Sequence, residues 1–490
     1  MNLLPRGARA RLATGATLVA TLMAPGVASA GPTAPVEAGP QASAAEDSAR
    51  PGADGIGDRY WPLDGNGGID VQHYDVHDAY DFDTGRLTGR TVLTITATQR
   101  LSSFHLDFLL PVSAVTVDGE PAEFTRPHKH ELRIVPSAVV PDEAQLTVEV
   151  VYTGVPGALT YAGESNWAAS DAEVVTMNEP HMATWWFPAN DHPTDKATFD
   201  VTITGPATHQ VVSNGLLVDR AVDGALATTH WRATHPMASY LAFFALGRYD
   251  IHESVRDGLP SYVAVSRELR RSERKASMRS LRRSGAITSW LEKRLGRYPF
   301  ESTGGLATSL DVGFALENQT RPTYSGWSST HRPTVVHELA HQWFGDSVSV
   351  SRWRDIWLNE GFATFMEGAY AEKHGGHSAR RQLRNDYDFL RHDAHVWGVD
   401  LTDPGPRDIF HQSVYDRGAL TLQALRQLIG DRVFWSVLRT WVRERRYGNG
   451  TVGAFQRLAE SKSDRDLDRF FRVWLEQRRP PARTKANGLR

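Results

Sequence analysis

The sequence predicts an α+β multidomain protein in which a β-rich N-terminal domain precedes a mostly helical domain. Its 490 residues are enough to bury two or more separate hydrophobic cores. Apolar and polar residues alternate between about 58 and 250, whereas helical spacing dominates from about 256 onward. A composition of 41% hydrophobic and 23% charged residues is that of a soluble globular protein, and it excludes a fibrous or wholly disordered chain.

The N-terminus has the features of an export signal. Residues 1–11 contain three arginines and no acid, residues 12–24 are apolar, and small residues ending at Ala30 follow. This order is typical of a secretory signal peptide, and the apolar stretch is too short to span a bilayer. We therefore expect a secreted, extracellular protein that is cleaved near Ala30 and has no membrane anchor.

The remaining chain divides by composition and periodicity into a linker, two domains and a tail. The linker is rich in Ala, Pro, Gly and Ser, a composition that predicts disorder. We expect a disordered linker over 31–57, an N-terminal β domain over 58–252, a helical domain over 253–480 and a loose tail over 481–490.

Alternation in QLTVEVVY (145–152) and ATFDVTI (197–203) predicts half-buried strands in the first domain. Asp118-Gly119 and Asn214-Gly215 are expected to form hairpin turns. One β-like stretch, 304–318, is expected among the helices of the second domain. The predicted helical segments are 266–295, 331–345, 355–375, 415–445 and 453–477.

Charge and cysteine content exclude several classes of function. No cysteine is present, which excludes a disulfide scaffold, a cysteine nucleophile and a thiolate-bound metal. The net charge of −3 gives no general attraction to nucleic acid. A basic run at 267–283 lacks interleaved aromatics, so a solvated helix face is favoured over a polyanion site. We expect no nucleic-acid partner and favour a monomer.

Residues 337–341 read His-Glu-Leu-Ala-His, a pattern that predicts a metal site. On a helix, His337 and His341 lie one turn apart on the same face and can bind one ion. Glu360, within the helical pattern DIWLNEGFATF, follows at a distance that allows a second helix to pack back and supply a third ligand. His₂Glu with one open position is the ligand set of a catalytic zinc site, so we expect one Zn²⁺ per chain. The alternative is two buried, hydrogen-bonded histidines and a surface glutamate.

This ligand set predicts hydrolytic chemistry. Zinc lowers the pKa of its bound water, and Glu338, beside the first ligand, is placed to take that water's proton. The oxyanion that forms then needs a further hydrogen-bond donor.

VVHELAHQWFGDSV and WLNEGFATF together resemble the zinc aminopeptidases of the aminopeptidase-N type, from about residue 58 to 478. HYDV at 73–76 and LEKRLGRYPF at 291–300 are similar as well. The resemblance implies a β saddle domain followed by a thermolysin-like catalytic domain, with no long C-terminal helical domain. It also implies peptide substrates with a free N-terminus.

The resemblance assigns roles residue by residue. It implies that His337, His341 and Glu360 are zinc ligands, that Glu338 is the general base and that Tyr415 steadies the tetrahedral intermediate. FALENQ (314–319) lies where the family has its Gly-x-Met-Glu-Asn motif. Glu317 is therefore expected to hold the substrate's α-amino group together with Glu179, and carboxylates near the zinc would favour an N-terminal ammonium. The further substrate-binding residues implied by this motif are Ala315 and Asn318.

Four positions depart from the family pattern and concern substrate preference. Phe314 occupies a position where the family has Gly, and Leu316 one where it has Met. Met177 and Arg417 occupy positions where the family often has Gln and Lys, respectively. The position one turn after Glu360, where thermolysin-like sites often have a carboxylate, is Thr364. A related epoxide hydrolase, an endopeptidase and a catalytically silent binding protein on the same scaffold remain alternatives.

Overall fold

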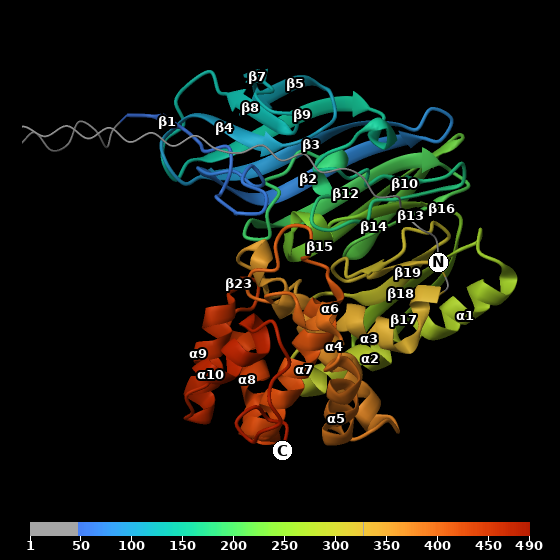
Figure 1. The fold of residues 1–490 in the computed structure, drawn as a ribbon. Coiled ribbons are helices and arrows are strands. Elements are labelled where there is room, and N and C mark those ends of the chain that lie inside the picture. Colours follow the sequence, from blue (N-terminus) through green and yellow to red (C-terminus); the bar gives the residue numbers. More distant parts are fainter. Residues whose placement is uncertain (1–47, 327) are drawn as a thin grey trace, which may run out of the picture. The chain divides into compact units, whose positions relative to one another are not determined.

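A β-rich segment and a following helical segment make up residues 48–326 and 328–490, which the computed structural model describes (Figure 1). This order of domains confirms the predicted fold class. The predicted signal peptide, its cleavage point near Ala30 and residues 31–47 of the predicted linker lie outside the described residues.

An eight-stranded sheet is the largest element of the β domain, and its adjacent strands β2 and β12 run parallel. The predicted alternation is present as alternating burial, with Phe199, Val201 and Ile203 of β12 on the buried face. Across the sheet the strands are β14 (Leu216–Asp223), β15 (Leu226–Ala238), β12 (Lys196–Pro206), β2 (Ile69–Asp81), β3 (Arg86–Ala97), β9 (Gln145–Gly154), β5 (Val112–Val117) and β6 (Glu120–Pro121).

Two four-stranded sheets complete the β domain. The expected disordered linker does not extend to residue 57, because the Arg50 N–H donates to the Arg100 carbonyl and the Gly52 N–H to the Ser103 carbonyl. Long-range backbone pairing thus orders a segment whose composition alone favours disorder. The first sheet comprises β1 (Arg50–Pro51), β4 (Leu101–Asp107), β8 (Glu131–Val135) and β7 (Glu123–Thr125). The second comprises β10 (Ala168–Ala169), β11 (Glu173–Val175), β16 (Phe244–Gly247) and β13 (Gln210–Ser213).

Only one of the two expected hairpin turns is present. Asp118 and Gly119 have φ of 52° and 83° between the paired strands β5 and β6, as a two-residue type I′ turn requires. Asn214-Gly215 instead connects two sheets, because β13 pairs with β16 whereas β14 pairs with β15. The Asn214 amide donates to the Leu241 carbonyl at 3.0 Å, so this asparagine anchors a crossover.

A five-stranded sheet begins the second domain. Its first strand starts at Tyr249, slightly before the expected boundary after residue 252, because the whole of that strand pairs with the next one. The expected β stretch at 304–318 covers all but the first residue of β19 and the whole of the edge strand β20. In spatial order the strands are β17 (Tyr249–Arg256), β18 (Leu259–Ser266), β19 (Thr303–Thr308), β21 (Thr323–Ser325) and β20 (Ala315–Leu316). A separate pair joins β22 (Ser349–Val350) to β23 (Asn449–Gly450).

Each predicted helical segment contains at least one α-helix, and the sequence did not predict α5 and α6. Gly430, with φ of 85°, separates α7 from α8 within one predicted segment. The helices are α1 (Arg271–Leu281), α2 (Ser284–Leu295), α3 (Arg332–His341), α4 (Trp357–Lys373), α5 (Ala379–Leu390), α6 (Ala394–Trp397), α7 (Gln412–Ile429), α8 (Asp431–Glu444), α9 (Val452–Ser463) and α10 (Asp468–Phe471).

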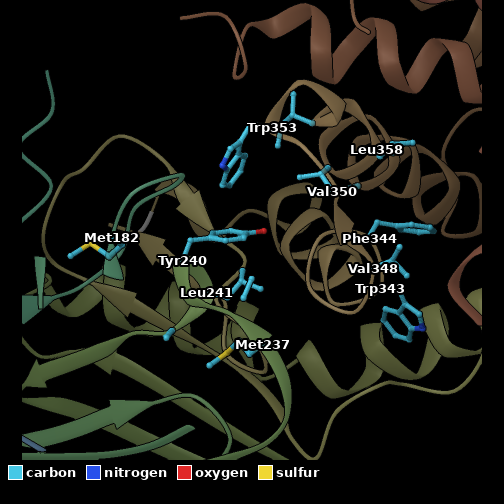
Figure 2. Close-up of a cluster of buried hydrophobic side chains, with 14 of the residues drawn as sticks. Met182, Met237, Tyr240, Leu241, Trp343, Phe344, Val348, Val350, Trp353 and Leu358 are labelled. Carbon is cyan, nitrogen blue, oxygen red and sulfur yellow. The ribbon is translucent and has the colours of Figure 1, made fainter. Parts of the chain in front are cut away.

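The two domains are joined by buried contacts. The Tyr240 ring of the β domain meets the Trp353 ring edge-on, with centroids 5.4 Å apart (Figure 2). Lys196, in β12, donates from its buried Nζ to the carbonyl oxygens of Asp346 (2.8 Å), Ser347 (3.2 Å) and Gly448 (3.1 Å). These contacts fix the position of the β domain against the segments between α3 and α4 and between α8 and α9.

The C-terminal residues pack on the helical domain, so the expectation of a loose tail over 481–490 is wrong. The Trp474 indole N–H donates to the Asn487 carbonyl at 3.2 Å, and the Asn487 amide donates to the Ala482 carbonyl at 2.8 Å. A buried indole N–H requires an acceptor, and the tail provides it. Among the described helices, none is both long and apolar enough to cross a membrane.

Helices α4 and α7 approach closely where Gly361 faces Gly418. A Cβ atom on Gly361 would lie 2.9 Å from the Gly418 Cα, closer than packed atoms tolerate. We expect Gly361→Ala to push the helices apart and lower the free energy of unfolding by about 1–3 kcal/mol. Denaturant unfolding measures this change.

Gly368→Ala on the same helix is the matched control. There the added methyl group meets only the movable end of the Gln382 side chain. We expect this variant to be neutral or slightly stabilised, because Ala favours a helix over Gly. Equal destabilisation of both variants would contradict the role given to the glycine contact.

Candidate active site

Helix α3 presents His337 and His341 on one buried face, one turn apart. Glu360 lies in the first turn of α4 and reaches back toward them. Its Oε2 is 3.2 Å from His337 Nε2 and 3.4 Å from His341 Nε2. The structure therefore brings together the three predicted metal ligands.

The separations between these atoms fit a tetrahedral metal ion. With bonds of about 2.1 Å, a tetrahedral ion holds its ligand atoms roughly 3.4 Å apart. Two imidazoles and one carboxylate are also donors that zinc accepts, and the cavity described below leaves one side of the site open. The donor set thus fits a catalytic zinc site.

Hydrogen bonds to the far side of each imidazole orient it. His341 Nδ1 lies 2.9 Å from the Phe344 carbonyl, so this nitrogen must carry the proton and leave Nε2 free to bind metal. His337 Nδ1 lies 2.8 Å from Glu367 Oε1. Both contacts favour the tautomer that binds a metal through Nε2.

Glu367 is a residue of the candidate site that the sequence did not predict. The position considered was Thr364, whose hydroxyl is 3.5 Å from His337 Nδ1, at the limit of a hydrogen bond. Glu367 lies two turns after Glu360 on the same face of α4. Because helical side chains tilt toward the helix N-terminus, a long glutamate at this position reaches back to His337. The i+7 spacing from Glu360 could have indicated it.

Glu338 lies beside the metal ligands. One of its oxygens is within 4.8 Å of ligand atoms of Glu317 and His341. Burial raises the pKa of Glu338 to about 8, although the neighbouring His337 and His341 act in the opposite direction. A carboxyl group with a pKa near neutrality can both accept and release a proton during turnover.

A cavity of about 430 Å³ opens over these residues. Its walls come from α3, α4, α7, the edge strand β20 and the segment of the β domain around residue 179. The lining residues are Asn178, Glu179, Phe314, Ala315, Leu316, Glu317, Thr334, His337, Glu338, His341, Glu360, Glu367, Phe410 and Tyr415.

Two further carboxylates, Glu179 and Glu317, converge beside the metal site. Each places an oxygen within 4.8 Å of the other and of Glu360. Glu317 Oε1 accepts a hydrogen bond from the Tyr240 hydroxyl at 3.3 Å, and Glu179 Oε1 is buried with no hydrogen-bond partner among the described residues. Burial raises the pKa of both carboxyl groups, so a cation between them would relieve an electrostatic cost.

Tyr415 and Ala315 lie in the cavity wall, as predicted. The Tyr415 ring stacks on the His337 ring, with centroids 6.0 Å apart and planes 23° apart. Burial raises the pKa of its hydroxyl well above the ordinary value, so the group stays protonated and can donate a hydrogen bond. Ala315 belongs to β20 at the edge of its sheet.

Asn318 does not line the cavity, contrary to the expectation that it contacts substrate. Its side chain is buried, and its amide donates to the Leu241 carbonyl at 3.1 Å. Met177 is also turned away, into the apolar cluster that contains Leu316, and Asn178 lines the cavity instead. The resemblance thus predicted the correct segments, but the side chains of Asn318 and Met177 point away from the cavity.

Among the other departures, only Phe314 is exposed at the cavity, with 39% of its surface accessible. Arg417 is fully buried and donates to the carbonyl oxygens of Trp474, Val399 and Gln477. It therefore anchors the C-terminal segment, and its expected effect on substrate preference is not supported.

Comparisons with known proteins agree with this geometry. Residues 71–241 match the protein family described as the Peptidase M1 N-terminal domain. Residues 305–474 match the one described as the Peptidase family M1 domain. The second match includes all three predicted metal ligands.

An M1 zinc metallopeptidase of Deinococcus radiodurans, solved as a mutant bound to a Tyr-Ser-Ala substrate, is 27% identical, with a TM-score of 0.78. The match covers 87% of this chain and 98% of that chain. Aminopeptidase M1 of Arabidopsis thaliana is 27% identical over 63% of this chain and 37% of its own length. A probable M1 family aminopeptidase of Encephalitozoon cuniculi is 27% identical over 70% of this chain.

The chain spans less than half of the length of these curated relatives, 45% in the Encephalitozoon case. The two family matches nevertheless cover the β domain and the helical domain, in the order and with the site described above. The protein belongs to the M1 family of zinc metallopeptidases.

Proposed function

We propose that this protein is a secreted zinc aminopeptidase that hydrolyses the N-terminal peptide bond of peptides. The observation that carries the proposal is the pair Glu179 and Glu317, whose carboxylates lie beside the metal ligands in one cavity. The similarity to Aminopeptidase M1 and to the glutamyl aminopeptidase of Sus scrofa, 26% identical over 62% of this chain, supports the same conclusion.

The carboxylate pair explains why a chain end would be recognised. A free N-terminus is an ammonium, and a buried carboxylate pair binds it through charge-assisted hydrogen bonds. Because both carboxylates lie within 4.8 Å of Glu360, the bound amino group would hold the first peptide bond next to the metal. An acylated N-terminus offers no such charge and would leave both carboxylates unpaired.

We propose that one zinc ion is held by His337, His341 and Glu360. When bound, zinc supplies a Lewis acid that lowers the pKa of water and polarises a carbonyl group. Glu338 accepts a proton at its carboxylate from the water that attacks the peptide carbon, and later gives this proton to the leaving amine as the C–N bond breaks. The Tyr415 hydroxyl donates a hydrogen bond to the oxygen that becomes negative.

Strand β20 is placed to align the substrate. It is the edge strand of its sheet, and its Ala315 lines the cavity. An extended peptide can add to such an edge through backbone hydrogen bonds, which read the chain direction without reading its side chains.

Secretion and a monomeric state belong to the proposal. The basic, apolar and small-residue segments that end at Ala30 support export. Mass spectrometry of the exported protein is expected to find an N-terminus near Gly31. An exported chain that begins at Met1 would contradict cleavage.

A panel of aminoacyl reporter amides tests the activity. We expect free aminoacyl amides to be hydrolysed, N-acetylated ones to be spared, and a zinc chelator to abolish turnover. Glu317→Gln should lower kcat/KM for free amines by about 30–1000-fold, which corresponds to roughly 2–4 kcal/mol for an ammonium that loses a buried ionic partner. Acetylated peptides cleaved as fast as free ones would instead indicate an endopeptidase.

Glu338→Gln tests the general base. We expect the variant to keep its zinc, because Glu338 is not a ligand, and to lose about 10²–10⁴-fold in kcat. Metal content and turnover are measured on the same preparation. The exposed Glu444→Gln on α8 is the control and should behave as the unchanged protein. Normal turnover by Glu338→Gln would rule out this base.

Glu367→Ala tests the orientation of His337. Removing a carboxylate that holds a metal-binding imidazole typically weakens metal affinity about 10–100-fold. Thr364→Val should have little effect, because its hydroxyl is 3.5 Å from the same nitrogen. Zinc competition with a chelator of known affinity measures both variants. Equal affinities for the two would mean that Glu367 does not support the site.

A further inference from the structure

A second cluster of potential metal ligands is buried in the β domain, outside the cavity. Asp107 is the last residue of β4 and Glu131 the first residue of β8, and they are direct partners in the antiparallel register of these neighbouring strands (Figure 1). His130 immediately precedes Glu131. Both carboxylates are fully buried, although like charges placed opposite each other destabilise a sheet. The pair therefore requires either a positive partner or a shared proton.

Three oxygens of this pair lack a hydrogen bond. Within the described part of the chain, neither oxygen of Glu131 nor Oδ1 of Asp107 has a hydrogen-bond partner. Asp107 Oδ2, by contrast, accepts hydrogen bonds from the N–H of Gly65 (3.2 Å) and Asp191 (2.8 Å) and from the Asn66 amide (3.0 Å). These donors satisfy Oδ2, whereas Oδ1 lies 3.6 Å from His130 Nε2.

The donor separations match those of the catalytic metal site. His130 Nε2 is 3.3 Å from Glu131 Oε1 and 3.6 Å from Asp107 Oδ1. The corresponding distances from the two histidines to Glu360 are 3.2 and 3.4 Å. Ligand atoms of Asp107, His130 and Glu131 all lie within 4.8 Å of one another. The Leu63 carbonyl (3.2 Å) and the Tyr161 hydroxyl (3.0 Å) also lie close to His130 Nε2.

No lysine or arginine side chain supplies the missing positive charge. Among residues 48–326 and 328–490, no lysine or arginine forms an ion pair with Asp107 or Glu131. His181 is paired with Asp64, with Nε2 and Oδ2 2.6 Å apart.

We propose that Asp107, His130 and Glu131 bind a second divalent transition-metal ion, of the zinc type. One imidazole nitrogen and two carboxylate oxygens are donors that zinc accepts, whereas calcium prefers oxygen ligands alone. The ion fastens the segment that carries Leu63, Asp64 and Gly65 to strands β4 and β8. In a chain without cysteines, it provides the cross-link that a disulfide would otherwise supply.

Metal content tests the proposal. The protein is stripped with chelator, reloaded with zinc chloride, desalted and analysed by mass spectrometry of the metal. We expect about two equivalents in the unchanged protein, about one in Glu131→Gln and about one in Glu360→Gln, which loses the catalytic ion. Glu123→Gln, at an exposed position on the adjacent strand β7, is the matched control and should keep two.

Thermal unfolding separates a bound ion from a proton shared between the two carboxyl groups. With an ion, Glu131→Gln should lower the Tm of the zinc-loaded protein. It should leave unchanged or raise the Tm of the stripped protein, because the substitution removes a buried like-charge pair. A shared proton predicts the same change in Tm with and without zinc, which would overturn the proposal.

Two further results would also overturn it: one equivalent in the unchanged protein, or no zinc in Glu360→Gln. The second result does not depend on the folding of Glu131→Gln. Binding of calcium chloride at this site in preference to zinc chloride would overturn the assignment to a transition metal. Peptidase activity is not used as a readout, so the proposed function and this site are tested separately.

Discussion

Negative charge buried around one cavity is the constraint on which the rest of this structure depends. Glu179, Glu317, Glu338 and Glu360 all line the same space. Several carboxylates taken out of water are tolerated only when cations or protons compensate them, because each buried ion costs several kcal/mol. In the proposed function, a metal among the two histidines and Glu360 would compensate one part, and a substrate ammonium between Glu179 and Glu317 would compensate another. The buried negative charge would then both bind the metal and select substrates with a free N-terminus.

The cavity depends on both domains. Glu179 comes from the β domain, whereas the metal ligands come from α3 and α4. Their relative position is set by buried contacts between the domains, namely the contact of Tyr240 with Trp353 and the three backbone carbonyls that Lys196 binds. A residue that never touches substrate can therefore change recognition of the chain end.

The metal ligands could be predicted from the sequence because helical geometry fixes the i, i+4 pair, and the pattern around Glu360 indicates a helix that packs against it. Side-chain direction could not be predicted. Asn318 and Met177 lie in the expected segments but point into the interior, and Glu367 reaches His337 from two turns beyond Glu360. Motifs locate a backbone segment, whereas contacts decide what each side chain does.

Long-range pairing accounts for the remaining differences. Residues 50–57 and 481–490 have compositions typical of linkers and tails, yet backbone hydrogen bonds to Ser103 and a bond from Trp474 order them. The cross-strand pair of Asp107 and Glu131 has no local signature, because only the register of β4 and β8 brings the two carboxylates together. Such features become visible only when the sheet is assembled.

Anomalous diffraction at the zinc absorption edge, from crystals of the protein loaded with zinc, tests the central claim most directly. The account predicts a strong anomalous peak in the cavity within bonding distance of His337 Nε2, His341 Nε2 and Glu360 Oε2. A fully loaded crystal without density among these three atoms would contradict it.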